Sequence, residues 1–468
     1  MRARTVAAVW AGKAAGAASR LLGRGGGTAI AGVVAERVDP QIVGALGRQA
    51  AAGTMCVTGT NGKTTTSLML SRIAREAGYA PLHNRSGSNL MRGFAATLVA
   101  AAGLDGRING AAQRLAIFET DEAVLPHLAR AVPPRAIVFL NLFRDQLDRF
   151  GEVDAVAGAW EEMIAGFSRH TAAAPVLVLN ADDPAVAHLG RAAAVPVVYY
   201  GIEDTSIAVA ETEHASDYRT CLECGAELAY SVTFYGHIGH WRCGRCGNAR
   251  SRPDVRVERL ALMQDASVME VALQDEALRV RLPMAGVYNA YNALAAIAGA
   301  TALAMPRAAI VRALEGFSAA FGRQERFTID GREVQVLLGK NPAGLNQVLR
   351  TLAARADEKR LVFILNDGLA DGRDISWIWD ADYELLRAQC AHVVASGTRA
   401  EDMALRLKYA GYGADPPLVR DRAAALRSAI DATPAGGTLY VIPTYTAMLE
   451  SRALLAKWSG TPPFWEDA

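Results

Sequence analysis

The sequence from position 57 to position 66 reads VTGTNGKTTT, and this stretch decides the fold. An apolar strand pattern at 55–57 leads into it, and a helical pattern at 64–77 follows it. In a glycine-rich turn between a strand and a helix, backbone N–H groups face phosphate oxygens and the helix N-terminus adds positive potential. The stretch therefore predicts a phosphate-binding loop for ATP in an α/β domain.

The loop supplies the groups that such a site needs. Lys63 is placed to reach the β and γ phosphates, and Thr64 is placed to ligate Mg²⁺. The general motif G-x-x-x-x-G-K-[ST] asks for glycine at position 57, where this chain has valine, so the loop is a shorter variant. The residues that we expect to bind ATP here are Gly59, Thr60, Asn61, Gly62, Lys63, Thr64 and Thr65.

Strand and helix patterns alternate after the loop. Apolar strand patterns end at Glu119, Asn141 and Asn180, and a helical pattern covers about 288–304. A turn-rich join near 321–327 precedes a second series of four strand patterns, VQVLL, LVFILN, HVVAS and TLYVIP. Such alternation is typical of doubly wound, mostly parallel sheets, which bind ligands at the carboxyl ends of their strands. We predict an N-terminal helical segment (1–49), a central nucleotide-binding domain (50–328) and a C-terminal Rossmann-like α/β domain (329–468).

Four of the six cysteines form one cluster. The pairs Cys221-x-x-Cys224 and Cys243-x-x-Cys246 are separated by 18 residues, which is the spacing of a four-thiolate Zn²⁺ site. We predict a structural zinc ion in a zinc-ribbon insertion at about 215–252. A redox-active cysteine pair and a nucleic-acid-binding ribbon are the alternatives, but the neighbourhood lacks a basic and aromatic surface, so we expect no nucleic-acid partner.

Composition sets further limits. A length of 468 residues indicates two or three domains, and a formal net charge of +1 gives no sign of a nucleic-acid partner. No apolar run reaches the roughly 18–20 residues that span a bilayer, so we expect a cytoplasmic protein. Residues 1–50 carry seven Lys or Arg against Glu36 and Asp39. We interpret the N-terminal stretch as an amphipathic helix that either packs on the next domain or contacts an anionic membrane surface at its inner face.

Six motifs, in order along the chain, carry a resemblance to a known family. They are GTNGKT at 59–64, FETDE at 118–122, NLFRDQLD at 141–148, NADD at 180–183, GVYNAYN at 286–292 and GRQE at 322–325. This series resembles the Mur ligase superfamily, the ATP-dependent amide-forming enzymes of peptidoglycan synthesis and folate polyglutamylation. The resemblance covers about residues 50–450 and implies a central P-loop domain of the Mur ligase type.

The resemblance implies further site residues. Glu119 is similar to the family's Mg²⁺-binding glutamate, Asn289 to the asparagine that touches adenine, and Arg323 to the arginine that approaches the phosphates from the domain junction. Gln146 stands where the family usually has histidine, a departure that weakens any metal role there. No lysine occurs between positions 64 and 339, so the carbamylated lysine of several members has no counterpart. About 50 residues precede the loop, where the ligases of peptidoglycan precursors carry a whole domain for the UDP group, so we expect no UDP-linked substrate held in that way.

Residues 360–380 read RLVFILNDGLADGRDISWIWD. Carboxylates at a strand end can bind a metal, orient a histidine or cap turns. With the Mur-type core and the cysteine module, this segment resembles the ligase subunits of lipid II isoglutaminyl synthase, which form heterodimers with a class I glutamine amidotransferase (GatD-like). The resemblance implies that an aspartate here completes the partner's Cys-His pair. We place that role at Asp367, with Asp371 and Asp374 as alternatives.

The implied activity is ATP-dependent amidation of the D-glutamate α-carboxyl in the lipid II stem peptide, through an acyl phosphate and with ammonia from the partner. A folylpolyglutamate-synthase-like or other Mur-type amino-acid ligase is the alternative, and a non-enzymatic ATP-binding or zinc-ribbon module is a third hypothesis. We expect no glutaminase activity in this chain, because Cys56 lies in the strand under the loop and Cys390 lies in a helix-like stretch with His392 on another face. Residues 340–344 are expected to face the cleft, where they contact substrate or form a turn.

Overall fold

The larger of the two main sheets is built around β1 (Gly53–Thr58), the strand that leads into the phosphate loop. The computed structural model describes residues 3–21, 28–84, 88–144, 153–168, 174–191, 193–209, 217–274, 276–317 and 323–461. The strand order is β11-β10-β9-β6-β5-β4-β1-β3-β2. The strands from β2 to β9 are parallel, and β10 is antiparallel to both of its neighbours, β9 and β11. The other strands are β2 (Ala80–His83), β3 (Arg114–Glu119), β4 (Ala136–Phe139), β5 (Val176–Asn180), β6 (Val197–Ile202), β9 (Val255–Leu262), β10 (Ser267–Leu273) and β11 (Glu276–Leu282).

Helices cover both faces of this sheet, because its parallel strands are apolar on both sides. Met55 and Val57 of β1 enter one core, and Cys56 between them enters the other. The first core lies under α4 (Lys63–Glu76), α10 (Val287–Ala302) and α11 (Arg307–Glu315). The second lies under α5 (Met91–Ala101), α6 (Leu125–Ala131), α8 (Val153–Ala165) and α9 (Pro184–His188).

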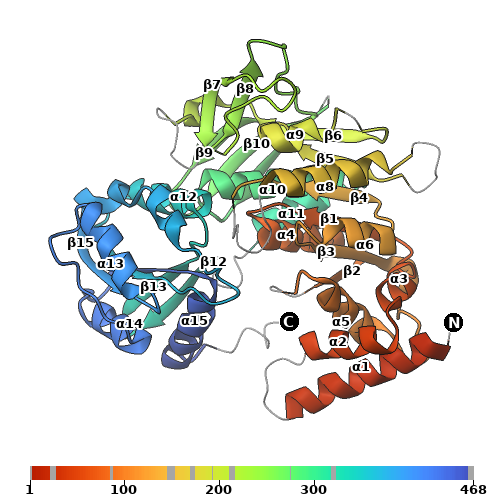
Figure 1. Ribbon diagram of the computed structural model, residues 1–468, viewed down its shortest axis with the longest axis horizontal. Coiled ribbons are helices and arrows are strands. Elements are labelled where there is room, and N and C mark those ends of the chain that lie inside the picture. The colour runs from red at the N-terminus through yellow and green to blue at the C-terminus, as the bar shows by residue number, and fades with distance from the viewer. Residues whose placement is uncertain are drawn as a thin grey trace.

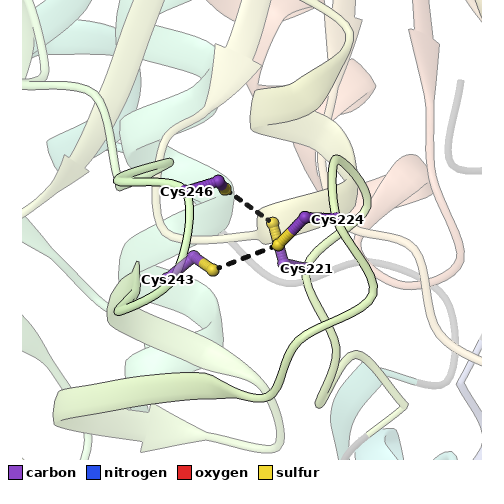
Figure 2. Close-up of side chains that lie close together, drawn as sticks. All are labelled: Cys221, Cys224, Cys243 and Cys246. Atoms are coloured by element: carbon purple, nitrogen blue, oxygen red, sulfur yellow. Dashed lines mark hydrogen bonds between the residues drawn. The ribbon is translucent and has the colours of Figure 1, made fainter.

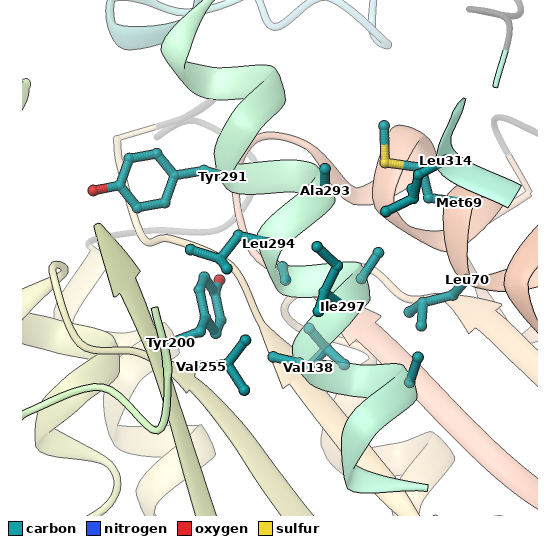
Figure 3. Packing of buried hydrophobic residues seen from close by; sticks show 14 of the residues in the cluster. Met69, Leu70, Val138, Tyr200, Val255, Tyr291, Ala293, Leu294, Ile297 and Leu314 are labelled. Atoms are coloured by element: carbon teal, nitrogen blue, oxygen red, sulfur yellow. The ribbon is translucent and has the colours of Figure 1, made fainter. Parts of the chain in front are cut away.

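Helix α10 is buried through most of its length and crosses the sheet behind the phosphate loop. Figure 3 shows Leu294 beside Tyr200 and Val255, and Ile297 above Val138. This packing fixes the N-terminal end of α10, which carries Asn289, relative to the loop.

The insertion forms a separate two-stranded antiparallel sheet of β7 (Leu228–Tyr235) and β8 (Ile238–Cys243). It stands at one end of the large sheet, at the top of Figure 1. The hairpin that the sequence predicts inside 215–252 is confirmed.

The C-terminal sheet has the order β12-β13-β16-β14-β15, and only the β12–β13 pair is antiparallel. Its elements are β12 (Arg323–Ile329), β13 (Arg332–Leu337), α12 (Pro342–Ala353), β14 (Lys359–Ile364), β15 (Cys390–Ser396), α13 (Ala400–Tyr409), α14 (Arg422–Asp431), β16 (Thr438–Pro443) and α15 (Tyr445–Ser459). The four predicted strands are confirmed.

Two local expectations in this half are wrong. The stretch from Arg323 to 327 is a strand and not a turn-rich join, because β12 turns back on β13 through Asp330-Gly331, and the predicted boundary at 328/329 cuts that strand. Both turn residues have positive φ, as a two-residue hairpin requires. Cys390 begins β15 and does not lie in a helix, because its backbone pairs with Lys359 of β14.

Three helices precede the large sheet: α1 (Ala3–Leu21), α2 (Thr28–Val38) and α3 (Ile42–Gly47). Helix α1 packs on α2 and α5, and a side chain at Gly12 would collide with the Ala31 carbonyl at 2.9 Å. The packing of the N-terminal helix on the neighbouring domain is therefore confirmed. None of the helices in the described part of the chain combines the length and the hydropathy that crossing a bilayer requires.

Candidate active site

The phosphate loop depends on two glycines for its path. Gly59 and Gly62 have φ of +131° and +91°, values that side chains rarely adopt. A Cβ at Gly59 would lie 2.8 Å from the Asn141 carbonyl oxygen, and one at Gly62 would lie 2.1 Å from Oδ1 of Asn292. The close approach of the chain on both sides therefore excludes a larger residue at either position.

Asn141, at the end of the neighbouring strand, clamps the loop. Its carbonyl accepts a hydrogen bond from Thr60 N at 2.9 Å, and its Oδ1 accepts one from Asn61 N at 2.9 Å. Its Nδ2 donates to the Asn61 carbonyl at 3.1 Å, and Thr60 Oγ1 exchanges hydrogen bonds with the backbone of Phe143. The loop is thus held in shape by the 141–143 segment.

Lys63 is buried at the start of α4 and folds back on the loop. Its Nζ donates to the carbonyls of Gly59 at 2.6 Å and Thr60 at 3.3 Å, and it forms an ion pair with Glu122 at 2.9 Å. Burial raises the pKa of Glu122, while the charge of Lys63 lowers it. Sequence reasoning missed Glu122, although it lies in the same FETDE segment as Glu119.

Glu119 ends β3, the strand that pairs with β1, and is almost fully buried. The amide of Asn84 fixes its backbone with two hydrogen bonds of 2.8 and 2.9 Å. Its Oε2 has no hydrogen-bond partner among the described residues, and a buried carboxylate oxygen without a partner is costly unless a cation binds it. This orphaned oxygen, on the strand next to the loop that carries buried Thr64, fits a Mg²⁺ site.

A cavity brings the phosphate loop, the start of α10 and the C-terminal domain together. Its lining is drawn from all three: Asn61, Gly62, Thr65, Asn141, Tyr235, Met284, Tyr288, Asn289, Asn292, Leu337, Leu338, Lys340, Ala343, Gly344, Gln347 and Val348. Asn289 is buried beneath it, with Nδ2 donating to the Ala285 carbonyl at 2.8 Å. Asn289 lies 227 positions after Gly62 in the sequence, yet both residues line the same pocket.

The C-terminal domain touches the loop directly. The side chains of Asn61 and Asn341 exchange hydrogen bonds of 3.0 and 3.3 Å. Asn341 also caps α12, because its Oδ1 accepts from Gly344 N at 2.8 Å. Residues 340–344 therefore face the cleft, as the sequence predicts, and the turn role is confirmed, whereas contact with substrate stays a prediction.

The four clustered cysteines converge from two loops, as Figure 2 shows. Their sulfur atoms all lie within 4.8 Å of one another, with Cys221 3.6 Å from Cys246 and Cys224 3.5 Å from Cys243. Tetrahedral Zn²⁺ with bonds of about 2.3 Å would place its sulfurs about 3.8 Å apart, so the cluster fits zinc. Backbone N–H groups of Cys246 and Arg245 lower the pKa of Cys243 to about 6, whereas the contacts of Cys246 with the other three cysteines raise its own pKa to about 12.

The cysteine module supports the pocket at several points. Gly239 N donates to the Asp182 carbonyl at 2.9 Å, and Trp241 Nε1 donates to the Ala181 carbonyl at 3.1 Å. Tyr235, at the end of β7, lines the cavity. The insertion therefore holds the NADD turn at 180–183. Through Tyr235, the insertion also connects the cysteine cluster to the pocket.

We expect the wild type to contain zinc and Cys243→Ser to contain none. The variant should also lower the unfolding free energy by about 3 kcal/mol and weaken ATP binding, because Tyr235 loses its support. Metal analysis, chemical denaturation and ATP titration measure the three effects. Cys390→Ser, outside the cluster, is the matched control and should change none of them. A zinc-free protein with unchanged stability would contradict this role.

Two sequence families match the chain. The family described as MurT ligase C-terminal matches residues 338–448, and the Mur ligase middle domain matches residues 57–240. The lipid II isoglutaminyl synthase (glutamine-hydrolyzing) subunit MurT of Staphylococcus aureus strain COL is 34% identical over 437 residues, which are 93% of this chain and 94% of that protein. The subunit of the same name from Streptococcus pneumoniae R6 is 32% identical, covering 97% of this chain and 98% of that protein. The chain belongs to the MurT family.

Solved structures agree on the fold of this MurT-family chain. A pseudomurein peptide ligase type C from Methanothermus fervidus matches with a TM-score of 0.63 and 22% identity, over 86% of this chain and 78% of that one. A MurF structure from Acinetobacter baumannii matches with a TM-score of 0.65 and 19% identity, over 92% and 81%. Folylpolyglutamate synthase of Mycobacterium tuberculosis with ADP matches with a TM-score of 0.61 and 15% identity, over 88% and 93%. These structures show that the chain has the fold of the Mur-type ligases.

The aspartates that follow β14 in this MurT-family chain differ in their contacts. Asp371 is buried and accepts hydrogen bonds from the backbone and side chain of Thr446 at the start of α15. Asp374 is exposed, and its carboxylate accepts a hydrogen bond from Ser376 N. The hydrogen bonds that the Ser376 side chain and backbone donate lower the pKa of Asp374. Asp367 is about one-third exposed, accepts from Thr398 Oγ1 at 2.8 Å, and lies 3.6 Å from Arg399.

Some predicted positions fall outside the described residues. They are the side chain of Arg323 and residues 145–148, including Gln146. Arg144, just before that segment, bridges the domains, since it pairs with Asp217 near the insertion and lies 3.6 Å from Asp380 of the C-terminal domain.

Proposed function

We propose that this chain uses ATP to convert the α-carboxyl of D-glutamate in the stem peptide of lipid II into a carboxamide, with ammonia from a partner glutaminase. The observation that carries the proposal is the shared cavity between the phosphate loop, Asn289 and the C-terminal domain. The names of the two MurT relatives, each called a glutamine-hydrolyzing lipid II isoglutaminyl synthase subunit, supply the substrate and the amide donor.

The proposed ATP site runs along this cavity. The phosphates would contact the loop residues Gly59, Thr60, Asn61, Gly62, Lys63, Thr64 and Thr65, and the adenine would lie beside Asn289. When Lys63 binds a phosphate, it gives up its hydrogen bonds to the loop carbonyls. Its ion pair with Glu122 keeps the buried ammonium group charged. We assign Arg323, at the junction of the central and C-terminal domains, to approach the phosphates, as the arginine that it resembles does in the family.

Thr64 and Glu119 are the residues that would hold Mg²⁺. Bound Mg²⁺ neutralises phosphate charge during phosphoryl transfer. The unpaired Oε2 of Glu119 supports this assignment, because Asn84 fixes the backbone at Glu119 without using that oxygen.

The chemistry follows from the poor reactivity of a carboxylate. A carboxylate oxygen of the substrate attacks the γ phosphorus, the bond to the β-phosphate oxygen breaks, and ADP leaves. Ammonia then attacks the acyl carbon, loses a proton, and expels inorganic phosphate to give the amide. Lys63 and the loop N–H groups stabilise the charge on the transferred phosphoryl group.

The ammonia is assigned to a second protein because the cysteines outside the metal cluster are poor nucleophiles. Burial raises the pKa of Cys56 to about 12 and that of Cys390 to about 11, so neither is a thiolate at neutral pH. The glutaminase that we propose is a class I amidotransferase, of the GatD type, in a heterodimer. We assign Asp367 to orient the histidine of the partner glutaminase, because Asp367 is accessible, whereas the carboxylate of Asp371 accepts a hydrogen bond from the start of α15.

The exposed surface near Asp367 supports such a contact. Leu369, two residues further on, is 77% exposed and offers an apolar group to a partner beside Asp367.

The experiment is an amidation assay with the chain, a class I glutaminase, ATP, lipid II and glutamine labelled with nitrogen-15 in its amide. Label in the D-isoglutamine of the stem peptide is expected, and only when ATP is present. Consumption of glutamine and ATP without label in the stem peptide would refute the proposal, and addition of an amino acid instead would favour the alternative ligase.

A further inference from the structure

Helix α1 presents an apolar face to solvent along its whole length. The exposed or partly exposed residues on this face are Ala3, Ala7, Trp10, Ala14, Ala17 and Leu21. At 3.6 residues per turn they share an arc of about 80°, opposite the buried face that packs on α2 and α5. Trp10 is 57% exposed and Leu21 is 88% exposed. An exposed helix face of a globular protein is normally polar, so this one calls for a binding partner.

The apolar face extends beyond α1. Trp10 Nε1 donates to the Leu104 carbonyl at 2.7 Å, which places the loop after α5 beside the indole ring, and Leu104 is 62% exposed. Ile30 of α2 is 43% exposed. Large apolar side chains of α1 and of the loop after α5 therefore reach solvent together at the outer edge of the molecule, where Figure 1 shows α1 lying beyond α2 and α5.

The charged side chains that α1 itself places beside this face are all basic. On the helical wheel Lys13 and Arg20 flank one side of the apolar arc and Arg4 flanks the other. The sequence contains no Asp or Glu from position 1 to position 35. Asp105, the acidic neighbour of Leu104, turns into its own loop and accepts a hydrogen bond from Arg107 N at 3.0 Å. A helix with an aromatic and aliphatic face between basic edges fits the boundary between anionic headgroups and acyl chains.

We infer that α1 and the Leu104 loop dock the enzyme on an anionic membrane surface, with α1 parallel to the bilayer. The inference rests on the proposed function in one respect: a lipid-linked substrate gives the enzyme a reason to bind where that lipid is. It assigns to α1 a task separate from nucleotide binding, since no α1 residue lines the cavity.

The test is co-sedimentation of the full chain with vesicles of phosphatidylcholine alone, or of phosphatidylcholine and phosphatidylglycerol in equal parts, both without lipid II. The chain is expected to bind the anionic vesicles and to release from them at high salt. The double variant Trp10→Glu/Leu21→Glu should bind on the order of a hundredfold more weakly, because two large apolar side chains no longer enter the interface. Lys13→Gln should weaken binding to the anionic vesicles alone, by about fivefold.

Leu262→Glu/Met263→Glu is the matched control. These two large apolar residues are 42% and 54% exposed at the end of β9, toward the opposite edge of the large sheet from β2, and the change should leave vesicle binding unaltered. Equal vesicle binding by the wild type and the Trp10→Glu/Leu21→Glu variant, or equal binding to neutral and anionic vesicles, would overturn the inference. A wild-type dimer that this variant converts to monomers would assign the face to a second copy of the chain and would also overturn it.

A second measurement separates this inference from the proposed function. In detergent micelles that carry lipid II, the Trp10→Glu/Leu21→Glu variant should amidate at the wild-type rate. Vesicle binding without any amidation by the wild type would remove the proposed function and leave the docking surface in place. Amidation without vesicle binding would remove the docking surface and leave the proposed function in place.

Discussion

Replacing Lys63 by alanine is expected to lower ATP-dependent turnover by about a thousandfold, because the variant loses the only lysine of the loop, the residue that we propose to stabilise the charge of the transferred phosphoryl group. The metal content and the binding of a partner should stay as in the wild type, because Lys63 contacts the loop carbonyls and Glu122 and belongs to neither the cysteine module nor the β14 end. Turnover is measured as ADP release in the presence of lipid II and glutamine.

The same change also leaves Glu122 as a buried carboxylate without its partner, which should cost about 3 kcal/mol of unfolding free energy. The double variant Lys63→Ala/Glu122→Gln removes both charges and separates the two effects. It should recover most of the lost stability and none of the lost turnover. Lys408→Ala, an exposed lysine on α13, is the control for removing a positive charge. Normal turnover in Lys63→Ala would mean that the loop does not handle the reacting phosphate.

Replacing Asp367 by asparagine is expected to lower glutamine hydrolysis by the partner about ten-thousandfold, because an amide cannot stabilise the histidine's required tautomer and its positive charge. Asparagine keeps the shape and can still accept the hydrogen bond of Thr398, so the fold should be unaffected. ATP binding should also be unchanged, as Asp367 does not line the cavity. Glutamate release and ATP titration measure the two effects.

Asp374→Asn serves as the comparison for this prediction. Asp374 is exposed on the same segment, but its carboxylate is occupied by Ser376 N. Full glutaminase activity in Asp367→Asn together with its loss in Asp374→Asn would move the assignment to Asp374. Full activity in both variants would remove this segment from the partner's site.

The sequence was informative where a function depends on neighbours in the chain. The glycine positions of the loop, the strand before it and the helix after it are local, and β1 and α4 lie where the pattern predicts them. The paired cysteines are equally local, since each pair sits in its own turn and the hairpin joins the pairs. Asn289 was found only through the family resemblance, because nothing local indicates that α10 begins beside the loop.

The features that were not predicted from the sequence are of two kinds. Some depend on contacts between residues far apart in the chain, and others had a local sequence signal that was not used. Glu122 pairs with Lys63 across 59 positions, and Asn84 fixes Glu119 across 35, so neither role is visible before the strands are aligned. Strand β12 is different, because Asp330-Gly331 between two alternating segments is a recognised hairpin signal that should have indicated it. Cys390 was misplaced because the 3₁₀ turns before it, at Tyr383–Gln389, carry the same periodicity as a short helix.

The central claim is that this chain itself activates the substrate carboxylate and that the partner only delivers ammonia. The most direct measurement gives the purified chain ATP, Mg²⁺ and lipid II, with either ammonium chloride or glutamine as the nitrogen source, and analyses the stem peptide by mass spectrometry. D-isoglutamine is expected with ammonium and not with glutamine, and Lys63→Ala should form none. Amide formation from glutamine by the chain alone, or a failure with ammonium when the complex is active with glutamine, would contradict the account.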